Sequence, residues 1–234
     1  MKQVTAQCKK KFGIPVQPPN FWLFDLDNTL YPAESELFVQ IDDRMGSYIS
    51  KILEVDRYEA RVLQKTYYAE YGTTLSGLIQ NHGVDPDAYL DYVHDIDLSA
   101  LDPSPRLDQV LKTLPGKKYI FTNGSVSHAE NIMARLGISE RFLGIHDIKA
   151  NNYVPKPDPS AYSEIVSRFG LLPEATIMLD DIPQNLIPAA NLGMATVWVK
   201  NTRWDGHLPE TEIDFVTENL VDWLSRIPEG GIGA

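Results

Sequence analysis

Short apolar runs alternate with segments of helical period through the second half of the chain. The runs have the length of strands buried on both faces, and they lie at 118–122, 143–148, 175–179 and 195–199, with a possible edge strand at 212–216. Helices are expected between and after them, at 105–114, 127–136, 159–169, 184–191 and 217–226. Strands that alternate with helices of about ten residues are typical of βαβ units. We therefore predict an α/β fold with a Rossmann-like, doubly wound parallel sheet.

The first half of the chain has a different pattern. Phe21–Phe24 is an uninterrupted apolar run, which predicts the first and most central strand. From Phe38 to Ile52 apolar residues then recur every three or four positions, as in an amphipathic helix. Three further helices are expected, near 57–71, 73–81 and 86–94. We therefore predict an all-helical cap domain inserted after the first strand. The boundaries are an irregular leader at 1–20, a core of 21–30 and 103–234, and a cap at 31–102.

Composition limits the environment and the partners. The longest apolar runs fall well short of the roughly 20 residues that cross a bilayer, and the single cysteine, Cys8, cannot form an internal disulfide. The first twenty residues lack the apolar segment of a secretory signal, so we expect a cytoplasmic protein. A net charge of −11 repels nucleic acids and anionic membranes, so neither is expected as a partner. An anionic substrate must be attracted by local groups.

Polar residues follow the ends of the predicted strands. They are Asp25, Asp27, Thr122, Asn123, Gly124, Lys156, Asp180 and Asp181. Each of them alone also fits an ordinary turn, helix cap or solvated lysine. In a doubly wound sheet, however, all these strand ends face one crevice. Clustered carboxylates favour Mg²⁺, whereas the lysine, the hydroxyl and the loop N–H groups favour a phosphoryl group.

Four segments resemble the motifs of the haloacid dehalogenase superfamily of phosphohydrolases. They are Asp25-Leu-Asp27-Asn-Thr, Phe121-Thr-Asn-Gly124, Lys156-Pro-Asp and Asp180-Asp181. The resemblance covers the chain from about Phe21 to Lys200, and the helical insert resembles the first-position cap of that superfamily. Its dehalogenases lack the second aspartate of the first motif, so Asp27 favours phosphate chemistry. The stretches Asp27–Pro32, Tyr71–Leu75 and His94–Asp97 resemble the pyrimidine 5′-nucleotidase group within it.

The resemblance implies a role for each motif residue. Asp25 would attack phosphorus to form an aspartyl-phosphate, and Asp27 would protonate the leaving oxygen and later deprotonate water. The phosphoryl oxygens would be held by Thr122, Asn123, Gly124 and Lys156. Mg²⁺ would be held by Asp25, the backbone carbonyl of Asp27, Asp180 and Asp181.

The cap is expected to carry the selectivity. Its candidate contacts to a nucleoside are Tyr31, Arg44, Tyr71, Thr73 and Thr74. The expected substrate is a small phosphorylated metabolite, with UMP or CMP as the first expectation. The alternative is phosphoglycolate, a sugar phosphate or a broad range of metabolites. A mutase and a non-catalytic binding protein are further alternatives. The five histidines lie far apart in the sequence, and we expect them at the surface or in the core.

Overall fold

The computed structural model describes residues 19–201 and 213–227, and within them the chain forms a six-stranded parallel sheet. The strand order is β3-β2-β1-β4-β5-β6. Their bounds are β1 (Phe21–Phe24), β2 (Lys117–Phe121), β3 (Ile145–His146), β4 (Thr176–Asp180), β5 (Ala195–Val199) and β6 (Phe215–Thr217). The predicted α/β fold is confirmed. The leader at 1–20 lies outside the described residues except for its last two positions.

Strand β1 lies at the centre of the sheet because its side chains are apolar on both faces. Trp22, Leu23 and Phe24 are fully buried. β1 pairs with β2 on one side and β4 on the other, both in parallel. The chain therefore builds outward from β1 in two directions, which places a topological switch point at the carboxyl end of β1.

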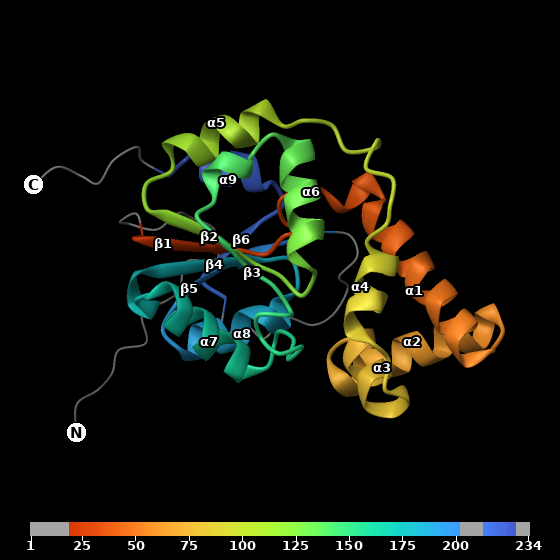
Figure 1. Ribbon diagram of the computed structural model, residues 1–234. Coiled ribbons are helices and arrows are strands. Elements are labelled where there is room, and N and C mark those ends of the chain that lie inside the picture. Colours follow the sequence, from red (N-terminus) through yellow and green to blue (C-terminus); the bar gives the residue numbers. More distant parts are fainter. Residues whose placement is uncertain (1–18, 202–212, 228–234) are drawn as a thin grey trace, which may run out of the picture.

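Helices cover both faces of the sheet (Figure 1). One face packs against α5 (Pro105–Thr113), α6 (Val126–Leu136) and α9 (Leu220–Leu224), and the other against α7 (Pro159–Phe169) and α8 (Pro183–Asn191). Short 3₁₀ turns lie at Ala33–Ser35, Ser139–Arg141 and Pro173–Ala175. Ser125 and Asp158 cap α6 and α7 through their side chains, so each helix begins at the carboxyl edge of the sheet.

The helical insert lies beyond the carboxyl ends of the strands (Figure 1). It contains α1 (Leu37–Leu53), α2 (Arg57–Tyr71), α3 (Thr74–His82) and α4 (Pro86–Val93). These helices share a hydrophobic cluster. Among the described residues, Ile148 is the one buried member of this cluster that lies outside the insert. This separate core supports the interpretation of the insert as a cap domain.

Three predicted elements differ from the observed ones. The strand expected at 143–148 is only Ile145–His146, which pairs with the end of β2. The edge strand expected at 212–216 is Phe215–Thr217, and residue 212 lies outside the described ranges. The last helix is shorter than expected because the Asn219 side chain caps it, accepting a hydrogen bond from the N–H of Asp222. In the described part of the chain, every helix is too short or too polar to cross a bilayer.

Candidate active site

The main-chain pairing of β1 with β4 brings the first two acidic motifs together. The N–H of Asp25 donates to the carbonyl of Leu179 at 2.9 Å, one residue beyond the last pair of the ladder. Asp25 therefore lies beside Asp180, the last residue of β4. The chain then turns sharply: the Leu26 carbonyl accepts from the N–H of Leu30, and Asn28 adopts a φ of 60°.

Three buried carboxylates form a cluster at this edge of the sheet. Asp25, Asp180 and Asp181 each offer one oxygen atom, and these atoms lie within 4.8 Å of one another. Such crowding is unfavourable for charged groups away from water. Burial raises the pKa of Asp25, the charge of Lys156 lowers it, and the charge of Asp180 raises it again. The result is a pKa of about 7. The pKa of Asp181 is also raised well above its usual value, first by burial and then by the negative charges of Asp25 and Asp180.

Lys156 supplies the positive charge inside this cluster. Its Nζ donates to Asp25 Oδ1 at 2.8 Å, Asp180 Oδ2 at 2.7 Å and the carbonyl of Phe121 at 2.8 Å. Burial alone would lower the pKa of Lys156, but Asp180 and Asp25 outweigh it and raise that pKa. The lysine backbone is held by Asn123, which accepts from its N–H at 2.8 Å and donates to its carbonyl at 3.1 Å.

The two neighbouring aspartates after β4 are used differently. Asp180 accepts from the N–H of Ile182 and, through both oxygens, from Asn185 Nδ2 at 3.0 and 3.1 Å, in addition to Lys156. Asp181 Oδ2 accepts from Asn201 Nδ2 at 2.9 Å. Asp180 is therefore held rigidly, whereas Asp25 and Asp181 each keep one oxygen that accepts no hydrogen bond within the described ranges. Asn185 and Asn201 were missed in the sequence because an amide has no distinctive pattern.

Asp27 points to a different set of partners. Its Oδ1 accepts from the hydroxyl of Tyr31 at 2.6 Å and lies 2.8 Å from His128 Nε2. Burial alone would raise the pKa of Asp27, but His128 and then Tyr31 lower it to about 2. Because the ionised carboxylate can only accept, His128 Nε2 carries the hydrogen.

His128 is buried, as expected for a histidine in the core, but it also contacts a catalytic-motif residue that the sequence analysis did not connect with it. It lies on α6, is 2% exposed and contacts a motif aspartate 101 positions away in the sequence. His94, just after α4, stacks on the His128 ring at 4.2 Å with an interplanar angle of 11°. Burial and then His128 lower the pKa of His94 to about 3. The only sequence signal for His128 was its place on the helix that follows Thr122-Asn123-Gly124.

The loop after β2 is tightly folded. Thr122 is 1% exposed, and its Oγ1 accepts the N–H of Gly124 at 2.9 Å. A Cβ atom at Gly124 would lie 3.3 Å from both Thr122 Oγ1 and the His128 ring, and 3.6 Å from His94 Nε2. Glycine therefore allows this loop to approach the paired histidines closely.

Four of the five cap candidates make their hydrogen bonds inside the insert or with the segment that leads from α4 back to the core. Arg44 bonds to the Tyr92 carbonyl and to Asp95, Tyr71 to Asn81, and Thr74 to the Gln64 carbonyl, while Thr73 caps α3. Tyr31 alone among the five bonds to a motif residue in this structure. Tyr68 on α2 was not anticipated: burial, then the charges of Asp181 and Asp180, raise its pKa, although its side chain is 47% exposed.

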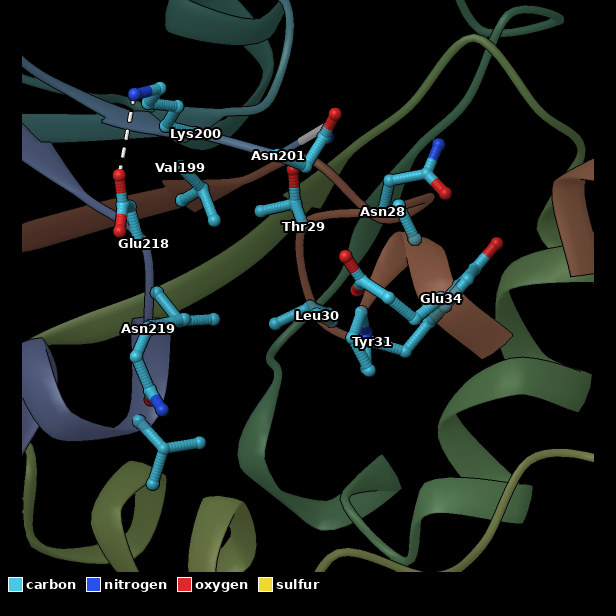
Figure 2. A pocket seen from close by; sticks show the side chains of 14 residues that line it. Asn28, Thr29, Leu30, Tyr31, Glu34, Val199, Lys200, Asn201, Glu218 and Asn219 are labelled. Atoms are coloured by element: carbon cyan, nitrogen blue, oxygen red, sulfur yellow. Dashed lines mark hydrogen bonds and ion pairs between the residues drawn. The ribbon is translucent and has the colours of Figure 1, made fainter. Parts of the chain in front are cut away.

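An open pocket of about 620 Å³ lies between the segment that follows β1 and the ends of β5 and β6 (Figure 2). It is lined by residues that follow β1, including Asn28 and Tyr31, and by residues around the ends of β5 and β6, including Asn201. Its described lining includes neither Asp25 nor Lys156. Two of its lining residues bond to motif aspartates: Asn201 to Asp181 and Tyr31 to Asp27.

Comparison with known proteins gives a consistent result. A family model described as haloacid dehalogenase-like hydrolase matches residues 22–193. Phosphate metabolism protein 8 of Saccharomyces cerevisiae is 31% identical over 218 residues, which cover 86% of this chain and 64% of that protein, so this chain spans less than two thirds of that relative. A Methanopyrus kandleri protein named glyceraldehyde 3-phosphate phosphatase is 28% identical over 224 residues, covering 85% of this chain and 94% of the relative.

A solved structure shares the fold. The crystal structure of a phosphatase of the same superfamily from Thermococcus onnurineus superposes with a TM-score of 0.61 at 17% identity, covering 91% of this chain and 100% of the other. At this identity the likeness establishes the architecture only.

Proposed function

The chain belongs to the haloacid dehalogenase-like hydrolase family, and from that premise we propose that it is a Mg²⁺-dependent phosphomonoester hydrolase. One observation carries the proposal: Asp25, Asp180 and Asp181 cluster at the carboxyl edge of the sheet, and Lys156 forms ion pairs with the first two. Phosphoryl transfer requires a nucleophile together with groups that neutralise the charge of the phosphate. This cluster supplies both kinds of group.

The donor set suits Mg²⁺. Hard oxygen ligands from a few carboxylates are what this ion prefers. Burial, and after it repulsion between the neighbouring aspartates, raises the pKa values of Asp25 and Asp181, and a divalent cation would relieve that repulsion. Asp25 and Asp181 would hold the ion through their unbonded oxygens, with Asp180 and the Asp27 carbonyl nearby. When bound, the ion would supply Lewis-acid stabilisation of the phosphoryl oxygens.

The reaction is proposed to proceed through two displacements at phosphorus. In the first, an oxygen of Asp25 attacks phosphorus and the ester P–O bond breaks. Asp27, which is ionised in the ligand-free site, takes up a proton on Oδ2 from solvent when the ester binds, and it delivers this proton to the departing alkoxide. In the second, Asp27 takes a proton from water as the water oxygen attacks phosphorus, and the bond from Asp25 to phosphorus breaks. Inorganic phosphate leaves, Asp27 releases its proton to solvent, and both carboxyl groups return to their starting states.

The residues around the cluster would divide the remaining work. Lys156 would keep Asp25 oriented and offset the charge of the transferred group, because its ammonium already touches both Asp25 and Asp180. Thr122, Asn123 and Gly124 would hold phosphoryl oxygens. For Gly124 this requires its N–H to leave the Thr122 hydroxyl, which accepts it in this structure.

The preferred substrate is proposed to be a pyrimidine nucleoside 5′-monophosphate. Support comes from the resemblance of Asp27–Pro32, Tyr71–Leu75 and His94–Asp97 to the pyrimidine 5′-nucleotidase group. Candidate contacts to the nucleoside are Tyr31, which faces Asp27, and the half-exposed Tyr68. Arg44, Tyr71, Thr73 and Thr74 could contribute only by exchanging the hydrogen bonds described above for bonds to substrate.

A specific observation favours a second candidate. The relative from Methanopyrus kandleri, of which this chain covers 94%, is named for glyceraldehyde 3-phosphate. Small sugar phosphates are therefore the second substrate class to test.

The decisive experiment is a substrate panel with the purified chain and Mg²⁺. We expect release of phosphate from UMP and CMP in preference to AMP, GMP, glyceraldehyde 3-phosphate and phosphoglycolate. Asp25→Asn should lower kcat at least about 10⁴-fold, because removal of a nucleophile has effects of that order. Wild-type rates in Asp25→Asn would refute the mechanism, preference for the triose phosphate would select the second substrate class, and isomerised product without free phosphate would identify a mutase.

A further inference from the structure

Asp27 is held by two donors on the same oxygen atom. Tyr31 Oη and His128 Nε2 both bond to Oδ1, at 2.6 and 2.8 Å. Among the described residues, Oδ2 accepts no hydrogen bond. The side chain of Asp27 is 16% exposed, so it retains access to a ligand in the crevice. The two donors thus select which oxygen of Asp27 remains available.

The His128 ring is held in place by its surroundings. It lies in the first turn of α6, where its N–H donates to Ser125 Oγ at 3.3 Å, and its ring is 1% exposed. One face of the ring is covered by His94, whose Nδ1 lies 3.0 Å from the same Ser125 hydroxyl. The ring cannot turn without losing the stack or the bond to Asp27.

The two stacked histidines come from different parts of the molecule. His128 belongs to a helix that packs on the sheet, whereas His94 directly follows α4, the last helix of the insert. The support of Asp27 is therefore built jointly from the core and from the segment where the chain leaves the insert.

We propose that His128 is a positioning residue for the acid–base step, holding Asp27 Oδ1 so that Oδ2 faces the leaving oxygen of the substrate, with His94 bracing the ring from the insert. The inference rests on the proposed function, since it assigns a task to the carboxyl group that would move the proton. It adds a residue outside the four motifs to the determinants of the reaction.

We expect the loss of kcat/KM in a His128 variant to depend on the leaving group of the ester. An alkyl phosphate needs a proton on its departing oxygen, whereas p-nitrophenyl phosphate releases a stable phenolate that departs with little help. Because kcat/KM reports the first irreversible step, it isolates bond cleavage from the later hydrolysis of the aspartyl-phosphate. Misplacing Asp27 should therefore reduce kcat/KM more for the alkyl ester than for the aryl ester.

The test compares His128→Leu and His128→Gln with the wild-type chain. We expect His128→Leu to lower kcat/KM about 10²- to 10³-fold for the alkyl phosphate that the substrate panel selects, and at least about tenfold less for p-nitrophenyl phosphate. In His128→Gln the side-chain amide N–H can replace Nε2–H, so that variant should recover most of the alkyl activity. His94→Phe, which keeps a stacking ring, should lose less than His94→Ala.

His82→Leu is the matched control. His82 also lies in a hydrogen bond to a tyrosine, Tyr67 at 2.6 Å, but this pair belongs to the insert and does not touch Asp27. Any loss in that variant should be equal for the two esters. Equal losses for both esters in His128→Leu, or no recovery in His128→Gln, would overturn the assignment.

A second measurement does not depend on turnover. In the ¹H–¹⁵N spectrum of the imidazole rings of the full chain without metal, His128 should carry its proton on Nε2, and Asp27→Ala should shift that signal. A proton found on Nδ1 with Nε2 bare would refute the positioning contact, even if the protein hydrolyses phosphate esters. Failure of the wild-type chain to release phosphate from any ester would instead refute the proposed function, and the tautomer would still decide whether His128 holds Asp27.

Discussion

Lys156 is a single residue on which we expect both the stability and the activity of this site to depend. It is 1% exposed and bonds to two of the three clustered carboxylates. A buried ion pair contributes little net stability compared with an apolar substitute of the same shape, but removal of one partner leaves uncompensated charge. Here the remaining charges would be Asp25, Asp180 and Asp181.

Lys156→Met should therefore lose both stability and activity. We expect the free energy of unfolding without metal to fall by about 3–5 kcal/mol, because breaking a buried pair costs that much, and hydrolysis to be severely impaired. Urea denaturation of the metal-free protein measures the first effect and steady-state kinetics the second.

Lys118→Met provides the control for a buried lysine outside the cluster. Lys118 is 8% exposed, and its Nζ bonds to the carbonyls of Leu114 and Gly116. We expect Mg²⁺ to recover part of the stability lost in Lys156→Met and none of that lost in Lys118→Met. Unchanged KM and kcat in Lys156→Met would remove this lysine from the site.

At the scale of elements, the insert depends on close contact between α2 and α3. Gly77 lies on α3 where the helix meets the Tyr67 side chain of α2, and a Cβ atom there would come within 2.4 Å of Tyr67 Cβ. That distance is far below van der Waals contact, so one helix would have to move. Gly46 on α1 is also helical, but a Cβ atom there would meet only Gln64 Oε1, at 3.6 Å.

We therefore expect substitution by alanine to change the stability of the protein in different ways at these two glycines. Gly77→Ala should destabilise the protein by about 1–3 kcal/mol through overpacking, despite the better helix propensity of alanine. Gly46→Ala should be neutral or stabilise by up to about 1 kcal/mol. Thermal and urea denaturation of both variants test this, and equal effects would contradict the described packing of α2 against α3.

At the scale of the whole molecule, the cluster couples folding to pH and to metal. Burial raises the pKa of Asp25 to about 7 from 3.8, and that of Asp181 is raised as well. Between those values the folded metal-free chain binds more protons than the unfolded chain does, so these two groups lower its stability as pH rises. Mg²⁺ competes with the same protons and favours the deprotonated folded state.

The stabilisation by Mg²⁺ should consequently grow with pH. We expect a small shift of Tm at about pH 5 and a larger one at about pH 8, where a concentration of about 100 Kd adds about 2.7 kcal/mol. For a domain of this size, each 1 kcal/mol corresponds to about 2–4 °C. Calorimetry with and without Mg²⁺ measures the shift. Asp181→Asn should reduce it, and a shift that is independent of pH would contradict the charge balance inferred for the cluster.

Much of the architecture followed from local pattern. The apolar run at Phe21–Phe24, the period of the helix after Phe38 and the alternation beyond Pro105 correspond to β1, α1 and the βαβ part. A strand buried on both faces is a continuous apolar run, and a helix buried along one side has an apolar residue every three or four positions. These elements were therefore predictable from the sequence. The convergence of Asp25, Asp180 and Lys156 followed from topology, because the carboxyl ends of parallel strands meet at one edge.

The tertiary structure alone decided how these side chains are paired. It joined His128 to Asp27 and His94 to His128, tied Asp180 to Asn185, and engaged Arg44 and Thr74 within the insert. Such pairings depend on the exact packing of helices and on rotamers, and they leave no periodic trace in the sequence. Residue order thus determined which strand ends would face the crevice, and packing determined which oxygen of each aspartate stays free to react.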